Sequence, residues 1–143
     1  MQGEHREYVT ETDFKKLAVA GELVLSQRLF GNKYGIRRTF LYQRYKWSVT
    51  ELHINNLIKA FSQGFPLISI GLVPLEIDYL KIRLLQRGTE NVSERRERFM
   101  SAKREVRKMC LKRRLFSLLV RFGKENENQV VDRVVSFLEP IIS

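Results

Sequence analysis

Apolar and polar positions at the start of the chain predict a short strand followed by an amphipathic helix. Residues 7–9 (EYV) have the composition of a strand. Thr10 follows as a helix N-cap, and Asp13 three residues later completes an imperfect capping box. Apolar side chains then recur at helical spacing over 14–20, and Gly21 ends the helix.

A second set of apolar positions predicts a β-hairpin and one further helix. Residues 23–25 and 29–30 favour a strand. The pair Gly31-Asn32 supplies the positive-φ positions of a tight turn. Residues 39–45 predict a helix.

From residue 47 onward the pattern alternates strands with helices. Residues 47–52 favour a strand, and apolar residues at 54, 57, 58 and 61 lie at helical spacing. Residues 66–73 form a continuous apolar run, which is typical of a buried parallel strand. Pro74 opens the next helix at its first turn, where a missing N–H costs nothing, and this helix ends at Arg87-Gly88.

The last fifty residues predict a long basic helix, a strand and a final helix. Ser93 caps the basic helix, which extends to about residue 114. Residues 116–120 form an apolar strand, and apolar positions over 130–141 line the final helix. Strands separated by helices of this length indicate βαβ units, so we expect an α/β fold with a mostly parallel sheet and flanking helices.

Charge is concentrated in one part of the chain. The net charge is +10, and residues 81–124 hold fifteen Lys and Arg against four Glu. A dense basic segment favours anionic partners such as phosphate groups, acidic protein or nucleic acid, the last bound non-specifically at most. The alternative is a solvated helix face that keeps the protein in solution. The candidate basic face comprises Arg104, Arg107, Lys108 and Arg113.

Several classes of site and protein are excluded or disfavoured by the sequence. No run approaches the roughly 18 apolar residues that span a bilayer, and the start of the chain lacks a secretory signal, so we expect a cytoplasmic protein. Cys110 is the sole cysteine, which rules out an internal disulfide and a cysteine zinc site. His5 and His53 lack an acidic or cysteine neighbour at metal-ligand spacing, so we expect structural roles and no metal. No general base accompanies Ser26, Ser48 or Cys110 in sequence.

Three motifs resemble those of guanylate kinases. The segment GELVLSQRLFGNKYG at 21–35 is similar to the family's GMP-binding lobe, with its Gly-Asn-x-Tyr-Gly ending. The segment LLQRGTE at 84–90, followed by 94–102, is similar to the family's lid and arginine helix. ELHINNL at 51–57 falls where the family has an Asp-x-Asp segment. The resemblance implies one partial domain over 1–143, with a small β lobe over about 3–45 and the core and lid over 46–143.

The departures from the family pattern remove its phosphate loop. Family enzymes begin with a strand, a glycine-rich loop ending in Gly-Lys-Ser/Thr, and a helix, in which backbone N–H groups and the lysine surround the ATP phosphates. The only Gly-Lys pair here, Gly123-Lys124, precedes Glu125 and has Leu118 in place of the opening glycine. We therefore expect a P-loop-kinase-like fold without its N-terminal strand and P-loop, and no cofactor.

The residues that contact guanine in the family are also replaced. The acid that accepts hydrogen bonds from the guanine edge falls on Leu25, and the hydroxyl after Tyr-Gly falls on Ile36. The second aspartate of Asp-x-Asp becomes His53, and an expected tyrosine becomes Arg6. A leucine leaves the hydrogen-bond donors of guanine unpaired, and the lost binding energy is large enough to reject the ligand. With the P-loop also missing, we expect GMP and ATP to bind weakly or not at all.

Three residues remain at family phosphate-binding positions: Tyr34 in the lobe and Arg87 and Arg98 at the lid. Each has a structural alternative. Tyr34 can close a hairpin turn, Arg87 can complement the C-terminal end of a helix dipole, and Arg98 lies among many other cations.

The resemblance implies a non-catalytic binding or interaction module for acidic or phosphorylated protein. Domains of this kind in membrane-associated scaffolds use the former GMP lobe to bind phosphorylated peptides. One alternative is a fragment of a guanylate kinase, an ATP:GMP phosphotransferase, whose P-loop segment is absent from this chain. The second is a polyanion-binding protein that uses the 81–124 face. Under every one of these interpretations, we expect that the sheet of this chain needs a partner or the N-terminal segment for completion, and that the chain is marginally stable alone.

Overall fold

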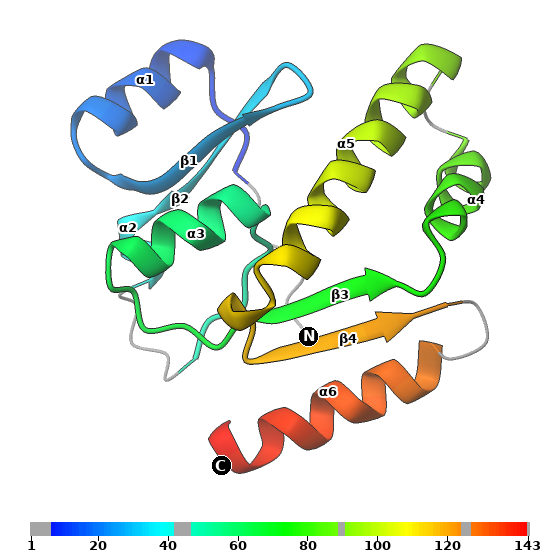
Figure 1. The fold of residues 1–143 in the computed structure, drawn as a ribbon. Helices are drawn as coiled ribbons and strands as arrows, with labels where there is room; N and C mark the ends of the chain where they lie inside the picture. The colour runs from blue at the N-terminus through cyan, green and yellow to red at the C-terminus, as the bar shows by residue number, and fades with distance from the viewer. Residues whose placement is uncertain (1–6, 42–46, 89–90, 124–126, 143) are drawn as a thin grey trace. The chain divides into compact units, whose positions relative to one another are not determined.

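The computed structural model describes residues 7–41, 47–88, 91–123 and 127–142. Its contacts divide the chain into two compact units, Met1–Glu51 and Leu52–Ser143. Both contain helices and strands, so the chain is a mixed α/β protein with two small sheets (Figure 1). None of the described helices combines the length and apolar character needed to cross a membrane.

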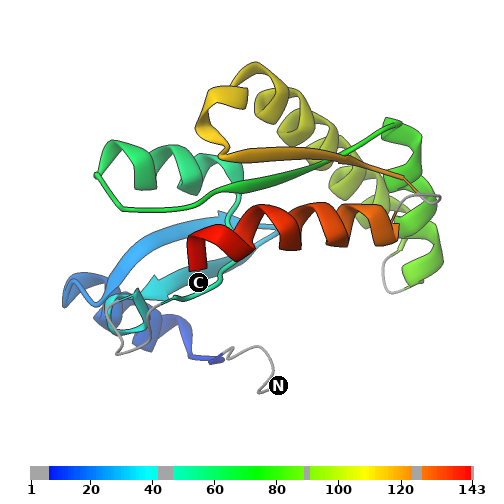
Figure 2. The same cartoon turned by 90° about the horizontal axis from the view of Figure 1, so that it is seen from below.

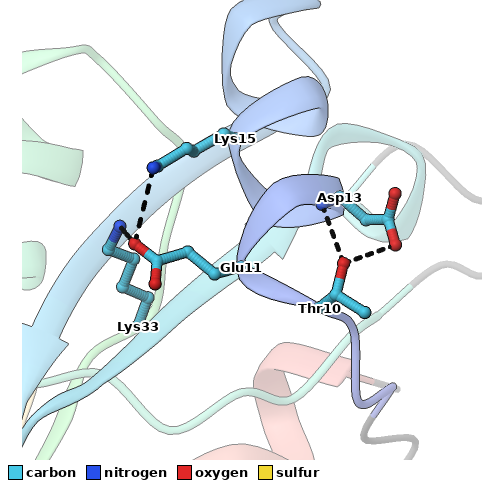
Figure 3. Close-up of polar contacts among 5 residues, drawn as sticks. All are labelled: Thr10, Glu11, Asp13, Lys15 and Lys33. Atoms are coloured by element: carbon cyan, nitrogen blue, oxygen red, sulfur yellow. Dashed lines mark hydrogen bonds and ion pairs between the residues drawn. The ribbon is translucent and has the colours of Figure 1, made fainter.

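The first unit begins with helix α1 (Glu11–Val19), whose N-cap confirms the prediction. The Asp13 backbone N–H donates to Thr10 Oγ1 at 3.1 Å, and Thr10 Oγ1 donates to Asp13 Oδ2 at 2.7 Å (Figure 3). The helix stops at Ala20, and Gly21 follows with φ of +70°. Only glycine adopts that conformation without strain, which is why the helix ends there.

An antiparallel hairpin follows, made of β1 (Leu23–Leu29) and β2 (Asn32–Arg37). Its connecting residues, Phe30 and Gly31, both have positive φ, 49° and 82°. Two such residues form the turn that matches the twist of paired strands. The predicted pair of positive-φ residues was Gly31 and Asn32. Gly31 is confirmed, but the other positive-φ residue is Phe30, and Asn32 is the first residue of β2.

A β-bulge near the start of β1 changes which side chains are buried. The register shifts between Leu23 and Leu25, so Val24 is the extra residue. As a result two consecutive side chains, Val24 and Leu25, are both buried. A regular strand would alternate them between faces.

Two predicted strands are wrong. Residues 7–9 and 47–52 have no regular secondary structure. A strand forms only against a partner, and none of the described strands pairs with either segment. The helix expected over 39–45 appears as the short α2 (Arg38–Leu41), and the rest of that range lies outside the described residues.

The second unit is built on a parallel strand pair, as the sequence predicts. Strand β3 (Ile70–Pro74) pairs with β4 (Leu118–Phe122) in the register Ile70↔Leu118 to Pro74↔Phe122. Helix α6 (Glu127–Ile142) packs along β4, and α5 (Val92–Leu111) packs against β3. The two views place α5 and α6 on opposite sides of the strand pair (Figures 1 and 2). Within the described part of this unit the sheet has two strands.

The remaining elements surround β3 and α5. Helix α3 (Ile54–Ser62) contacts α5 and the 3₁₀ turn η1 (Arg113–Leu115), and α4 (Ile77–Arg87) contacts both α5 and β3. The predicted end of α4 is confirmed, since Gly88 is left-handed at φ 64°. Buried apolar side chains form the core of this unit: Ile54, Leu57, Ala60, Val73 and Val120.

Some boundaries differ from the expected ones because of hydrogen bonds made across the chain. Helix α4 begins at Ile77, not Pro74, since Pro74 still pairs with Phe122 and the Leu75 N–H donates to Phe122 O at 2.7 Å. Strand β3 begins at Ile70, four residues after the start of the apolar run.

The N-cap of α5 is Asn91, not Ser93. Asn91 Oδ1 accepts from the Glu94 N–H at 2.9 Å, and Glu94 Oε2 accepts from the Asn91 N–H at 3.0 Å. This reciprocal capping box satisfies two backbone donors at once, so it is favoured over a single serine cap.

Candidate functional site

The two hairpin strands present different residues on their two faces. Alternation along the strands puts Leu25, Gln27, Tyr34 and Ile36 on one face. The ladder pairs Leu25 directly with Ile36, and Gln27 with Tyr34. Leu25 is 2% exposed and Ile36 half-buried, whereas Tyr34 is 46% exposed. The two positions predicted to have lost guanine contacts are therefore cross-strand neighbours.

The pair of Leu25 and Ile36 cannot hydrogen-bond to a ligand through its side chains. Leu25 and Ile36 offer no hydrogen-bond acceptor or donor on their side chains, and they lie at the short separation of paired strand residues. A purine edge placed against them would leave its donors unpaired, at a cost of about 1–3 kcal/mol for each donor. Apolar pairing of this kind instead stabilises the hairpin itself.

The opposite face of the hairpin carries Ser26, Arg28, Lys33 and Gly35, and α1 packs over it. A Cβ added to Gly35 would lie 3.1 Å from Leu23 Cδ1 and 3.4 Å from Phe14 Cε2. Glycine at this position therefore allows the close approach of the helix side chain to the strand.

Charged side chains join α1 to this face. Glu11 Oε1 accepts a hydrogen bond from Lys33 Nζ at 2.8 Å and lies 3.7 Å from Lys15 Nζ (Figure 3). The hydrogen bond from Lys33, with the positive charges of Lys33 and Lys15, lowers the pKa of the Glu11 carboxyl below its ordinary value. The carboxylate is thus held ionised between two ammonium groups.

Two shallow hollows flank α1. One is lined by Thr12, Lys15, Lys16, Val19 and Ala20. The other, of about 330 Å³, lies between α1 and the hairpin and is lined by Phe14, Lys15, Ala18, Ser26, Gln27, Arg28 and Lys33. Neither hollow is lined by Leu25, Tyr34 or Ile36. Sequence reasoning missed the second one, because its cations come from three separate segments.

The two predicted lid arginines belong to the second unit, and Tyr34 to the first. Arg87 is exposed and is the last residue of α4, the position at which a cation complements the helix dipole. Arg98 is half-buried on α5 and engaged by another group. Residues 89–90 of the lid motif, and Arg6 and Lys124, lie outside the described residues.

His53 caps α3, and it has an acidic neighbour that the sequence did not reveal. His53 Nδ1 accepts from the Asn55 N–H at 3.2 Å, and its Nε2 lies 3.6 Å from Glu105 Oε1. The same Glu105 oxygen accepts from the Ile54 N–H at 3.0 Å. A carboxylate at a helix N-terminus is stabilised by the helix dipole. The pair is separated by 52 positions, so local spacing could not indicate it.

The four residues of the predicted basic face are not equivalent. Arg104, Arg107 and Arg113 are exposed, but Lys108 is half-buried and donates a hydrogen bond to Asn55 Oδ1. Further exposed cations lie between positions 96 and 114: Arg96, Lys103, Lys112 and Arg114. Within the part of the chain that the structure describes, no ion pair engages any of these seven exposed side chains.

Known proteins with similar sequences include three curated guanylate kinases. That of Wolbachia sp. subsp. Brugia malayi (strain TRS) is 27% identical over 110 residues, 71% of this chain and 54% of that protein. That of Wolbachia pipientis wMel is 27% identical over 110 residues, covering 71% and 52%. That of Paraburkholderia xenovorans (strain LB400) is 27% identical over 109 residues, covering 74% and 48%. The chain spans about half the length of these relatives, and no family model matches it.

Proposed function

Since this chain is guanylate-kinase-like in sequence, we propose that it is a non-catalytic interaction module that binds a phosphate-bearing or acidic protein. The observation that carries the proposal is the cross-strand pair of Leu25 and Ile36. Under the alignment to the family, this pair replaces the acid and the hydroxyl that contact guanine. A protein selected for GMP turnover would retain those groups, because their loss removes both affinity and selectivity.

The candidate contacts for the partner's phosphate or carboxylate groups are Tyr34, Arg87 and Arg98. Tyr34 has a half-exposed phenol on the hairpin. An exposed guanidinium such as that of Arg87 offers a planar fork of donors that suits phosphate and carboxylate. Tyr34 and Arg87 are thus exposed to an anion even though, under the family alignment, the guanine contacts are replaced.

A calorimetric titration with GMP, ATP and a phosphopeptide tests the proposal. Binding of the phosphopeptide with no measurable heat from GMP is the expected result. Tight, guanine-selective binding of GMP would contradict it, because the assignment of Leu25 and Ile36 to guanine contacts would then be wrong.

The enzyme alternative is a fragment of an ATP:GMP phosphotransferase. It is favoured by the fact that the chain spans about half the length of the guanylate kinases it matches. Coding sequence upstream that contains a Gly-Lys-Ser/Thr loop would support this alternative. Leu25 and Ile36 would still argue against GMP as the substrate.

Restoring the family residues tests the alignment of the hairpin. Leu25→Glu alone should lower the free energy of unfolding by about 2 kcal/mol or more, because it buries a carboxylate without a partner. Adding Ile36→Ser puts a hydroxyl donor directly opposite, so the double variant should lose less than the sum of the two single variants. Urea unfolding of the four proteins measures this coupling.

The same double variant should prefer GMP to AMP in calorimetry. Leu25→Met with Ile36→Val is the matched control, since it keeps the apolar pair and should bind neither nucleotide. A folded Leu25→Glu, Ile36→Ser protein without any guanine preference would show that these positions do not face the base.

A second candidate function, polyanion binding, is favoured by the exposed cations of α5 and η1. Seven exposed Lys and Arg lie between positions 96 and 114, with Glu97 as the exposed acid. Phosphate or sulfate polymers bind such surfaces by releasing counterions, so binding weakens steeply with salt.

We expect the protein to be retained on heparin at low salt, and charge reversal of α5 to abolish retention. The variant carries Glu in place of Lys103, Arg104, Arg107 and Arg113; Lys108 is kept because it bonds to Asn55. The control reverses four exposed cations elsewhere, namely Lys16, Lys59, Lys81 and Arg133, and has the same net charge. Equal loss of retention in both variants would mean that total charge alone is responsible.

A further inference from the structure

Three cations from separate segments meet at the hollow between α1 and the hairpin. Lys15 comes from α1, Arg28 from β1 and Lys33 from β2, and all three line the hollow of about 330 Å³. Phe14 and Ala18 form its apolar wall. We propose that this hollow is a binding site for a phosphate monoester.

The hairpin places two of these cations in direct opposition. Arg28 and Lys33 are ladder partners, so their side chains leave the same face of the sheet side by side. Like charges directly opposite each other destabilise a strand pair. No carboxylate of the described residues pairs with Arg28, so the repulsion is only partly relieved. An anion lying between the two side chains would remove it.

Glu11 is the carboxylate that contacts both lysines among the described residues of the site. Its Oε1 lies 2.8 Å from Lys33 Nζ and 3.7 Å from Lys15 Nζ (Figure 3). Each ammonium has three donors, so each can bind a second anion while it keeps Glu11. The three cations exceed the single carboxylate by two charges, which matches the charge of about −1.5 to −2 on a phosphate monoester at pH 7.

The wall residues indicate which monoester fits. Phe14 and Ala18 offer apolar contact to the group that carries the phosphate, and Ser26 offers a hydroxyl beside it. A phosphate carried by an aromatic ring suits the site, because the ring can contact the apolar wall while the phosphate contacts the cations. The ring can belong to a small molecule or to a phosphotyrosine side chain. Since Arg28 and Lys33 lie on the face opposite Tyr34, the inference does not depend on the proposed function.

Titration of the ¹⁵N-labelled chain with phenyl phosphate, a phosphotyrosine peptide and inorganic phosphate tests the site by NMR. We expect saturable shifts of the amides of Ser26, Arg28 and Lys33, with phenyl phosphate bound more tightly than inorganic phosphate. Tighter binding of the peptide than of phenyl phosphate would identify a phosphoprotein as the source, and equal binding a small molecule. Shifts that are confined to α5, or that never saturate, would overturn the proposal.

Three variants locate the ligand. Arg28→Gln with Lys33→Gln should weaken phenyl phosphate binding by about two- to fivefold for each exposed cation removed. Glu11→Gln should tighten binding, because it removes a like charge beside the phosphate. Lys59→Gln with Lys81→Gln, exposed cations of the second unit, is the charge-matched control and should leave the affinity unchanged. An equal loss in the control, or weaker binding in Glu11→Gln, would contradict a site at this hollow.

Discussion

The 143-residue chain is expected to show no ATP-dependent phosphorylation of GMP. Phosphoryl transfer depends almost entirely on positioning and charge stabilisation, and the parts that hold the β- and γ-phosphates and Mg²⁺ are a glycine-rich loop, its lysine and a hydroxyl. The sequence contains no Gly-Lys-Ser/Thr segment, and Gly123-Lys124 is followed by Glu125. Under the proposed alignment the acceptor's base also meets the apolar pair of Leu25 and Ile36 instead of hydrogen-bonding groups.

A coupled spectrophotometric assay of ATP-dependent GMP phosphorylation tests this prediction. Turnover should lie at least about a thousandfold below the roughly 1–100 s⁻¹ that is typical of kinases. The guanylate kinase of Paraburkholderia xenovorans, assayed in parallel, is the positive control. Turnover by the isolated chain in the typical range would overturn both the alignment and the proposal of a non-catalytic module.

Gly71→Val is expected to destabilise the second unit by about 3 kcal/mol, the upper end of the usual range for overpacked cores, because the neighbouring side chains leave little room. A Cβ at Gly71 would lie 2.5 Å from Leu119 Cδ1 and 2.8 Å from Phe116 Cδ1. The leucine methyl can rotate away, but the Phe116 ring is part-buried and has less freedom. The better strand propensity of valine recovers less than about 1 kcal/mol.

Urea unfolding followed by circular dichroism gives the free energy of each variant. Leu72→Ala is the control from the same strand, since Leu72 is 49% exposed and its truncation should cost far less. Equal effects of the two substitutions would mean that β3 does not lie against Leu119 and Phe116 as the structure places it.

Features that depend on neighbouring residues were predictable from the sequence. The Thr10 cap, the Gly31 turn and the end of α4 at Gly88 each follow from a few adjacent side chains, and all three are confirmed. The existence of β3 and β4 as strands of a parallel sheet also followed, because both are continuous apolar runs separated by helices; their direct pairing with each other did not.

Features that depend on a distant partner were not predictable. The segments 7–9 and 47–52 resemble strands in composition, yet strand formation requires a neighbour that composition does not specify. The contacts of Glu11 with Lys33 and of His53 with Glu105 join residues 22 and 52 positions apart. The bulge at Val24 shifts the side-chain alternation by one residue, and nothing in the apolar pattern indicates it.

The direct opposition of Leu25 and Ile36 has a consequence for evolution. Under the proposed alignment, recovery of a guanine site needs changes at both positions. The route through Leu25→Glu crosses a protein with an unpaired carboxylate at a 2% exposed site, and the route through Ile36→Ser weakens the hairpin while gaining no ligand. Each single step is therefore selected against, although the two steps together are compatible. Under that alignment, the packing of the two apolar side chains against each other makes their replacement of the guanine contacts hard to reverse one substitution at a time.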